Sequence, residues 1–160
     1  MVKLKHNQSQ LRFKMKNFIG RSRLFYRLLF FLRNGITRNI VSKETDIVIE
    51  GFPRSGNSHF YNLVSIRSNN NINIASHLHV NAQISHAIKL DKPIVVLIRE
   101  PIDTILSLII MFPKIELKTA LSAYIDYYRY VCQHVEKITV IDFKLITSSP
   151  DDALNIINEN

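Results

Sequence analysis

The amino-acid sequence predicts an α/β protein with a parallel sheet of about four strands flanked by helices. Short β-branched or apolar runs alternate with segments of helical periodicity, and this alternation favours parallel strands joined by crossover helices. The predicted strands lie at about 46–50, 72–76, 94–99 and 138–143. With 160 residues, of which 46% are hydrophobic, the chain is able to bury one core but scarcely two. We therefore expect one α/β domain over residues 41–160, preceded by a separate segment.

That preceding segment, residues 1–40, holds most of the positive charge. It contains ten Lys and Arg residues and no acid, which leaves eleven basic against thirteen acidic residues, a net charge of −2, in the remaining 120. The large apolar residues near one face of a predicted helix are Phe18, Phe25, Leu28, Leu29 and Leu32. A basic amphipathic helix of this kind is able to lie on an anionic membrane, and packing on the domain is the alternative.

The same segment is not expected to cross a membrane. Its apolar stretch, residues 24–32, is interrupted by Arg27 and is shorter than the ~20 residues that a transmembrane helix needs. No small-residue cleavage site marks a signal peptide. The basic residues do not extend into the domain and no nucleic-acid-binding motif accompanies them, so nucleic acid is not an expected partner. We expect a cytoplasmic protein, with peripheral membrane contact through residues 1–40 as the open alternative.

A loop with two glycines follows the first predicted strand. Gly51 and Gly56 allow backbone conformations that let consecutive amide N–H groups point at a phosphate beside a helix N-terminus. Ser58 adds a hydroxyl donor, and the apolar residues that follow have helical spacing. The pattern predicts an anion-binding loop, and an ordinary glycine-rich turn is the alternative.

The charge within this loop differs from that of nucleotide-triphosphate loops. The spacing fits the pattern G-x-x-x-x-G-K-[ST], but Asn57 stands in place of the lysine. Arg54, inside the loop, carries the positive charge instead. An arginine offers several donors to anionic oxygens, which suits a group transfer in which charge grows on the leaving oxygen.

The third predicted strand ends at a second arginine. Arg99 closes the run of residues 94–99, and Ser107 lies eight residues later on the predicted next helix. The carboxyl edge of a parallel sheet is where open α/β folds bind ligands, and an arginine there can hold a phosphate bidentately. A surface ion pair of Arg99 with Asp103 or Glu100 is the alternative.

Two histidines follow the second predicted strand. His77 and His79 end an alternating run that begins at Asn71, and they share a face if the strand persists. A histidine with a pKa near neutrality is able to accept a proton from a hydroxyl, and exposed histidines at a polar strand end are the alternative. A zinc site would need a third ligand such as His86, and no spacing indicates one, so we expect no metal.

The clearest predicted helix spans about 116–136 and is expected to bury one apolar stripe. The stripe consists of Leu117, Leu121, Tyr124, Ile125, Tyr128, Val131, Cys132 and Val135. Tyr127 and Tyr130 are expected to point away from it. Ser149 and Pro150 are expected to open a final helix.

These motifs together resemble a known family. The segment Pro53-Arg54-Ser55-Gly56-Asn57-Ser58 is similar to the 5′-phosphosulfate loop of sulfotransferases that use 3′-phosphoadenosine 5′-phosphosulfate, whose usual form is Pro-Lys/Arg-Ser-Gly-Thr-Thr/Ser. Asn57 departs from that form, as does His59, where the cytosolic branch usually has tryptophan; arginine at 54 is common in the carbohydrate and tyrosine branches.

Two further segments carry the same resemblance, which covers roughly residues 46–158. Arg99 and Ser107 match the arginine and serine that bind the 3′-phosphate in this family, and Ser76-His77-Leu78 resembles the Thr-His-Leu that carries its general base. The Gly-x-x-Gly-x-Trp segment of the cytosolic branch has no counterpart here, because the chain has no tryptophan. The C-terminal lid over the nucleotide is therefore expected to be missing.

The resemblance implies a P-loop-like domain that transfers a sulfuryl group from 3′-phosphoadenosine 5′-phosphosulfate to a hydroxyl of a carbohydrate or other small acceptor, without a metal. It implies that Arg54 neutralises the leaving oxygen, that Arg99 and Ser107 hold the 3′-phosphate, and that His77 or, less favoured, His79 is the base. The residues expected around the 5′-phosphosulfate are Gly51, Arg54, Ser55, Gly56, Asn57 and Ser58. The alternatives are a P-loop kinase or other nucleotide enzyme, and an inactive nucleotide-binding or membrane-attached interaction protein.

Overall fold

The predicted strands pair into one open, all-parallel sheet. The computed structural model describes residue 15 and residues 39–158. Within this part of the chain the four strands lie in the order β2-β1-β3-β4, with every neighbouring pair parallel. The strands are β1 (Ile47–Gly51), β2 (Ile74–Ser76), β3 (Ile94–Ile98) and β4 (Thr139–Asp142). The predicted α/β class and the parallel sheet are confirmed.

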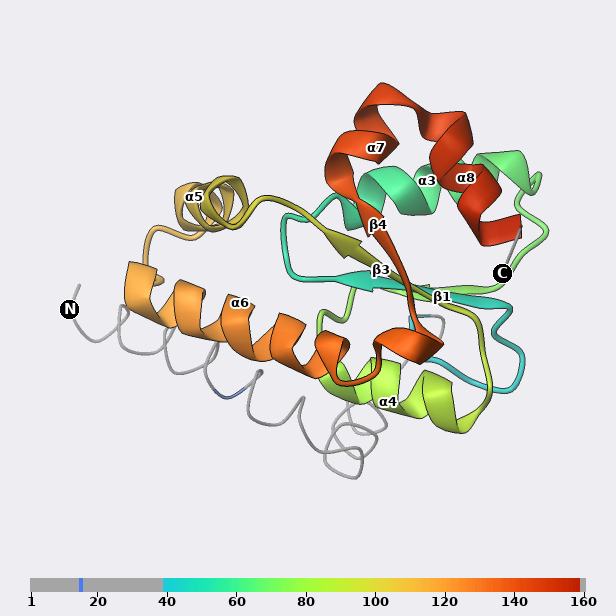
Figure 1. Ribbon diagram of the computed structural model, residues 1–160, viewed down its shortest axis with the longest axis horizontal. Helices are drawn as coiled ribbons and strands as arrows, with labels where there is room; N and C mark the ends of the chain where they lie inside the picture. Colours follow the sequence, from blue (N-terminus) through green and yellow to red (C-terminus); the bar gives the residue numbers. More distant parts are fainter. Residues whose placement is uncertain (1–14, 16–38, 159–160) are drawn as a thin grey trace.

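Helices cover both faces of this sheet (Figure 1). One face lies under α3, α7 and α8, the other under α4 and α6, and α5 lies beyond the carboxyl ends of the strands. The helices are α3 (Asn57–Arg67), α4 (Asn81–Lys89), α5 (Pro101–Met111), α6 (Leu117–Cys132), α7 (Phe143–Ser148) and α8 (Pro150–Asn158), with a 3-10 turn at Val135–Lys137. Residues that follow the strands are thus gathered at one end of the molecule, between α5 and α3.

The central strands are buried on both faces. Ile47 and Ile49 of β1 belong to the core cluster that contains Phe60 of α3. Val48 points the other way and belongs to the cluster that contains Tyr124 of α6. Because both faces are covered, the strand is a continuous β-branched run rather than an alternation of apolar and polar residues.

The face of α6 that packs on the sheet differs from the predicted apolar stripe. The buried residues of this helix are Ala120, Tyr124, Tyr127, Tyr128 and Val131. The stripe residues that are instead exposed are Leu117, Leu121, Ile125, Cys132 and Val135. The prediction was wrong for these five residues and for Tyr127, which lies in the core.

The physical reason is that the hydroxyls of two buried tyrosines of α6 find backbone partners. Tyr124 Oη donates to the carbonyl oxygen of Arg99 at 2.9 Å, and Tyr128 Oη donates to that of Leu97 at 2.7 Å. A buried tyrosine with a satisfied hydroxyl contributes a large apolar ring to a core. Compared with the predicted orientation, α6 is therefore turned about its axis, so that its tyrosines and not its leucines face the sheet.

The second predicted strand ends at residue 76 as expected and does not continue to the histidines, whereas the last predicted strand ends one residue earlier than expected. β2 ends at Ser76, because His77 and His79 both have positive φ angles, 67° and 54°. The expectation that the two histidines share a strand face therefore does not hold. The last strand ends at Asp142, whose carboxylate accepts a hydrogen bond from the Lys144 N–H at 2.7 Å and so caps α7, a helix that the sequence did not predict.

The start of the final helix was predicted correctly, since α8 has Pro150 as its first residue. The predicted amphipathic helix within residues 1–40 lies outside the described residues, apart from Met15, Asn39 and Ile40. Across residues 39–158, no helix has both the length and the apolar character needed to cross a membrane.

Candidate functional site

The loop between β1 and α3 forms the centre of the candidate site. Arg54 and Gly56 have positive φ angles of 76° and 95°, and Gly56 is the residue that precedes the first turn of α3. That first turn contains no acidic side chain, and no side chain caps it. The N–H groups at the start of α3, and the positive end of its dipole, are therefore available to an anion.

Both glycines of the loop are also required by packing. A Cβ atom on Gly51 would lie 2.7 Å from the carbonyl oxygen of Leu97, and one on Gly56 would lie 2.6 Å from Cδ2 of Phe143. Real Cβ atoms do not approach other atoms this closely, so side chains at these two positions would displace β3 or the Phe143 ring. The loop thus lies directly against the carboxyl ends of β3 and β4.

Arg54 reaches across to the helix that follows β3. Its Nε donates to Ser107 Oγ at 2.9 Å, and its Nη1 lies 3.8 Å from Met111 Sδ. No carboxylate of the described residues forms an ion pair with Arg54. The structure therefore brings two predicted site residues, Arg54 and Ser107, into direct contact, and leaves the arginine charge without an acidic partner there.

Arg99 lies one residue beyond β3, which ends at Ile98 and not, as predicted, at residue 99. Its Nη1 donates to the carbonyl oxygen of Arg54 at 3.3 Å, and its guanidinium lies 4.6 Å from the centroid of the Phe143 ring. Its Nη2 is 3.9 Å from Asp103 Oδ2, at the limit of an ion pair, and its buried Nε has no hydrogen-bond partner among the described residues. A buried donor without an acceptor is costly, so an anion that reaches Nε would be favoured.

Two residues of the loop have buried side chains. Ser55 is fully buried and its Oγ lies 3.1 Å from the hydroxyl of Tyr128. Asn57, which occupies the position of the usual lysine, donates from its side-chain amide to the carbonyl oxygen of Phe52 at 3.2 Å. Both side chains thus hold the loop conformation through contacts within the protein.

Tyr128 supports the loop from below. Its hydroxyl donates to the Leu97 carbonyl, lies near Ser55 Oγ, and accepts from the Phe52 N–H at 3.4 Å. Burial raises the pKa of this hydroxyl above its ordinary value, so it stays protonated and able to donate. The helical spacing of Tyr128 predicted only a place in an apolar stripe and carried no signal that its hydroxyl reaches the loop.

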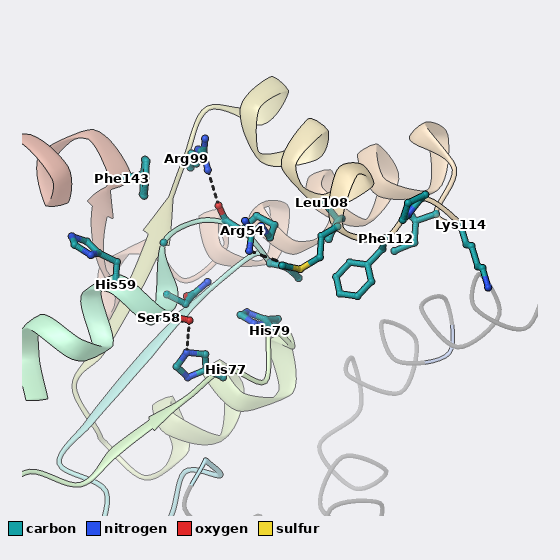
Figure 2. Close-up of a pocket in the computed structure, with 16 residues that line it drawn as sticks. Arg54, Ser58, His59, His77, His79, Arg99, Leu108, Phe112, Lys114 and Phe143 are labelled. Carbon is teal, nitrogen blue, oxygen red and sulfur yellow. Dashed lines mark hydrogen bonds between the residues drawn. The ribbon is translucent and has the colours of Figure 1, made fainter. Parts of the chain in front are cut away.

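The two histidines lie on the opposite side of the loop from Arg99 (Figure 2). His77 Nε2 is 3.1 Å from Ser58 Oγ, and burial lowers the pKa of its ring, which favours the neutral form that can accept a proton. His79 Nδ1 is 2.8 Å from the carbonyl oxygen of Gly51. Because a carbonyl oxygen only accepts, Nδ1 carries a proton, and in the neutral ring the lone pair is at Nε2.

A buried glutamate organises the turn that carries the histidines. Glu50, the fully buried penultimate residue of β1, accepts hydrogen bonds from the N–H groups of Leu78 and His79 at 2.9 and 2.8 Å. The same carboxylate lies 3.7 Å from His79 Nδ1. The strand pattern of residues 46–50 did not predict this role of Glu50, although a carboxylate at the end of a β-branched run is a signal that a polar partner lies nearby.

These residues surround a cavity of about 860 Å³ at the carboxyl end of the sheet. Its lining residues are Pro53, Arg54, Gly56, Asn57, Ser58, His59, His77, His79, Arg99, Leu108, Met111, Phe112, Pro113, Lys114, Ile115 and Phe143. A second hollow of about 430 Å³ is lined by Ser107, which does not line the first. Arg54 and Arg99 line both spaces.

The described residues contain no group of three His, Cys, Asp or Glu side chains that could hold a metal ion. Comparison of the chain with family models, with curated proteins and with solved structures gives no match.

Proposed function

We propose that this chain is a P-loop-like sulfotransferase that binds 3′-phosphoadenosine 5′-phosphosulfate and moves its sulfuryl group to a hydroxyl of a carbohydrate or other small acceptor. The observation that carries the proposal is the hydrogen bond from Arg54 Nε to Ser107 Oγ, 2.9 Å long. It joins the two sequence segments that resemble the family's 5′-phosphosulfate loop and 3′-phosphate site. Two phosphate-binding segments that are in contact can hold one doubly phosphorylated nucleotide.

The electrostatics of the site support an anionic ligand. Arg54 and Arg99 both line the cavity, and α3 adds its uncapped N-terminus. No Asp or Glu is present among the described residues that line it. The resulting positive potential favours phosphate and sulfate groups over neutral ligands.

The proposed reaction forms a bond between the acceptor oxygen and sulfur while the bond from sulfur to the bridging phosphate oxygen breaks. Arg54 neutralises the negative charge that the leaving phosphate gains, which matters more in the transition state than in the bound nucleotide. His77 accepts the proton of the acceptor hydroxyl, and its lowered pKa keeps the ring unprotonated at neutral pH. Ser58, which contacts His77 Nε2, orients the ring.

Binding of adenosine 3′,5′-bisphosphate and of ADP, measured by calorimetry on the full chain, tests this proposal. A site that holds a 3′-phosphate should bind the bisphosphate at least about tenfold more tightly, since a lost hydrogen bond to a charged group costs roughly 1.5–3 kcal/mol. Arg99→Ala should remove most of that preference and Ser107→Ala a smaller part. Arg129→Ala, which deletes an arginine paired with Asp126 on α6, is the matched control and should change neither affinity.

The same titration separates the sulfotransferase from a kinase or other nucleotide enzyme. In the described structure the lysine position of nucleotide-triphosphate loops is filled by Asn57, whose amide is bonded to the Phe52 carbonyl. If ADP or ATP binds more tightly than adenosine 3′,5′-bisphosphate, especially with Mg²⁺, the proposal is contradicted and a kinase is favoured. Tight binding of the bisphosphate without turnover of the sulfated donor would identify an inactive nucleotide-binding protein.

A further inference from the structure

The cavity has two chemically different ends. Figure 2 shows Arg99 and Phe143 at one end and Leu108 and Phe112 at the other, with His79 nearer to the second. The first end contains Arg99 and the start of α3, which suit the anionic donor, and Arg54 lies between the two ends. The second end is built from the last turn of α5 and the loop that leads to α6. Its described lining residues are Leu108, Met111, Phe112, Pro113, Lys114 and Ile115.

The apolar end has a fixed floor and an accessible rim. Leu108 and Ile115 are 1% and 7% exposed and belong to the core, whereas Met111 and Phe112 are 51% and 49% exposed. The rim is held by the backbone, because the Phe112 N–H donates to the Leu108 carbonyl and the Ile115 N–H to that of Phe112, both at 2.9 Å. An apolar surface that exists before the ligand arrives lowers the cost of ordering on binding.

This end is poorly suited to a sugar. Among its described lining residues only Lys114 carries a side-chain hydrogen-bonding group of appreciable strength, and a lysine donates but does not accept. A glycan buries several hydroxyl groups, and each needs a donor and an acceptor to replace water. An apolar molecule gains from burial against Met111 and Phe112 and leaves no polar group unsatisfied.

We infer that the acceptor is an apolar alcohol, whose hydroxyl meets the histidines while its ring or alkyl body packs against Met111 and Phe112. This inference rests on the proposed function and narrows its acceptor class. The acceptor oxygen bonds to sulfur and its proton passes to His77. The nucleotide leaves with the electrons of the broken sulfur–oxygen bond. Met111 lies 3.8 Å from Arg54 Nη1, so the apolar surface begins next to the group that neutralises the leaving oxygen.

Calorimetric titration of two alcohols of similar size, 2-naphthol and methyl β-glucopyranoside, tests the inference on the full chain saturated with adenosine 3′,5′-bisphosphate. Naphthol should bind at least about tenfold more tightly, and Phe112→Asn should weaken it by about tenfold, as expected for loss of a few methylene equivalents of buried apolar contact. Ile125→Asn is the matched control: Ile125 is 45% exposed but does not line the cavity. It should leave naphthol binding unchanged.

Tighter binding of the glucoside, or equal naphthol affinity of Phe112→Asn and the unmutated chain, would overturn the inference. Failure of the bisphosphate to bind would instead overturn the proposed function. In that case the naphthol titrations of the same variants without nucleotide still decide whether this end of the cavity selects apolar alcohols.

Discussion

The guanidinium of Arg54 and the hydroxyl of Ser107 are joined by a hydrogen bond of 2.9 Å, although the two residues are 53 positions apart in the chain. Arg54 belongs to the loop after β1 and Ser107 to the helix after β3. Because these strands are neighbours in a parallel sheet, their carboxyl ends lie side by side. A ligand that binds one segment therefore also meets the other.

Arg54 should be more important for turnover than for nucleotide affinity. Arg54→Ala should lower the rate of sulfuryl transfer by about 100-fold or more, because electrostatic stabilisation of the leaving group is lost. Arg54→Gly should lower the rate equally. Its free energy of unfolding should be about 1 kcal/mol higher than that of Arg54→Ala, since glycine accepts the φ angle of 76° without strain. Rates and urea denaturation of both variants measure this, and an unchanged rate would remove Arg54 from the mechanism.

The hydroxyl of Tyr128 should determine how well the loop is ordered. Tyr128→Phe keeps the ring but removes the contacts to Leu97, Ser55 and Phe52, so we expect a loss of roughly 1–3 kcal/mol in unfolding free energy and weaker anion binding.

Tyr127→Phe is the matched control for Tyr128→Phe. The neighbouring Tyr127 is also buried, but its hydroxyl has no hydrogen-bond partner among the described residues. Its removal should be neutral or stabilising, without an effect on bisphosphate affinity. Equal effects of the two substitutions would show that the Tyr128 hydroxyl does not support the loop.

Substitutions of His77 and His79 should differ in their effects on turnover and on stability. His77→Asn should abolish the proton-accepting role and leave nucleotide binding largely intact, whereas His79→Asn should be milder for turnover. His79→Asn should cost more stability, because it removes the contact to the Gly51 carbonyl beside the buried Glu50. Turnover rates that rank the variants in the reverse order would assign the base to His79.

Lowering the pH should destabilise the unmutated chain more than His77→Asn. Burial lowers the pKa of His77 in the folded state, whereas the unfolded chain binds this proton near the ordinary histidine pKa of about 6.5. The unfolded state therefore binds more protons between the two pKa values. The stability that the neutral ring contributes is complete above about pH 6.5 and is lost as the pH falls toward the folded pKa.

Denaturation of the unmutated chain and of His77→Asn at a series of pH values measures the difference in their free energies of unfolding. Because the other histidines are present in both proteins, their contributions cancel in this difference. The acidic limb of kcat/KM should lie below about pH 6.5 for the same reason. A constant stability difference across this range would contradict the lowered pKa.

The sequence was sufficient for the strands because β-branched runs such as Ile94–Ile98 are buried on both faces and tolerate little else. It was not sufficient for α6, because Leu121 and Tyr124 are both apolar enough to occupy a core. The choice between them depends on whether a tyrosine hydroxyl reaches a backbone carbonyl, which is a property of the assembled fold.

In the candidate site, too, some features follow from the local sequence and others depend on the assembled fold. Loop chemistry led to Gly56, whose φ angle is 95°, and to Arg54, which lines the cavity, because both lie in one short stretch of the sequence. The spacing of the histidines was misleading, because His77 and His79 lie in a turn with positive φ angles rather than in a strand. The carboxylate that fixes this turn belongs to Glu50, far away in the sequence, and pairwise contacts of that kind leave no local periodicity.

The packing of the Phe143 ring against Gly56 determines when, during synthesis of the chain, the loop is able to fold. The ring occupies the space that a Cβ atom on Gly56 would need, and it is supplied by the first residue of α7, long after the loop in the order of synthesis. Contacts between distant parts of a chain form slowly, because closing the intervening loop costs entropy. We therefore expect a nascent chain to complete the loop between β1 and α3 late, only after β4 has left the ribosome.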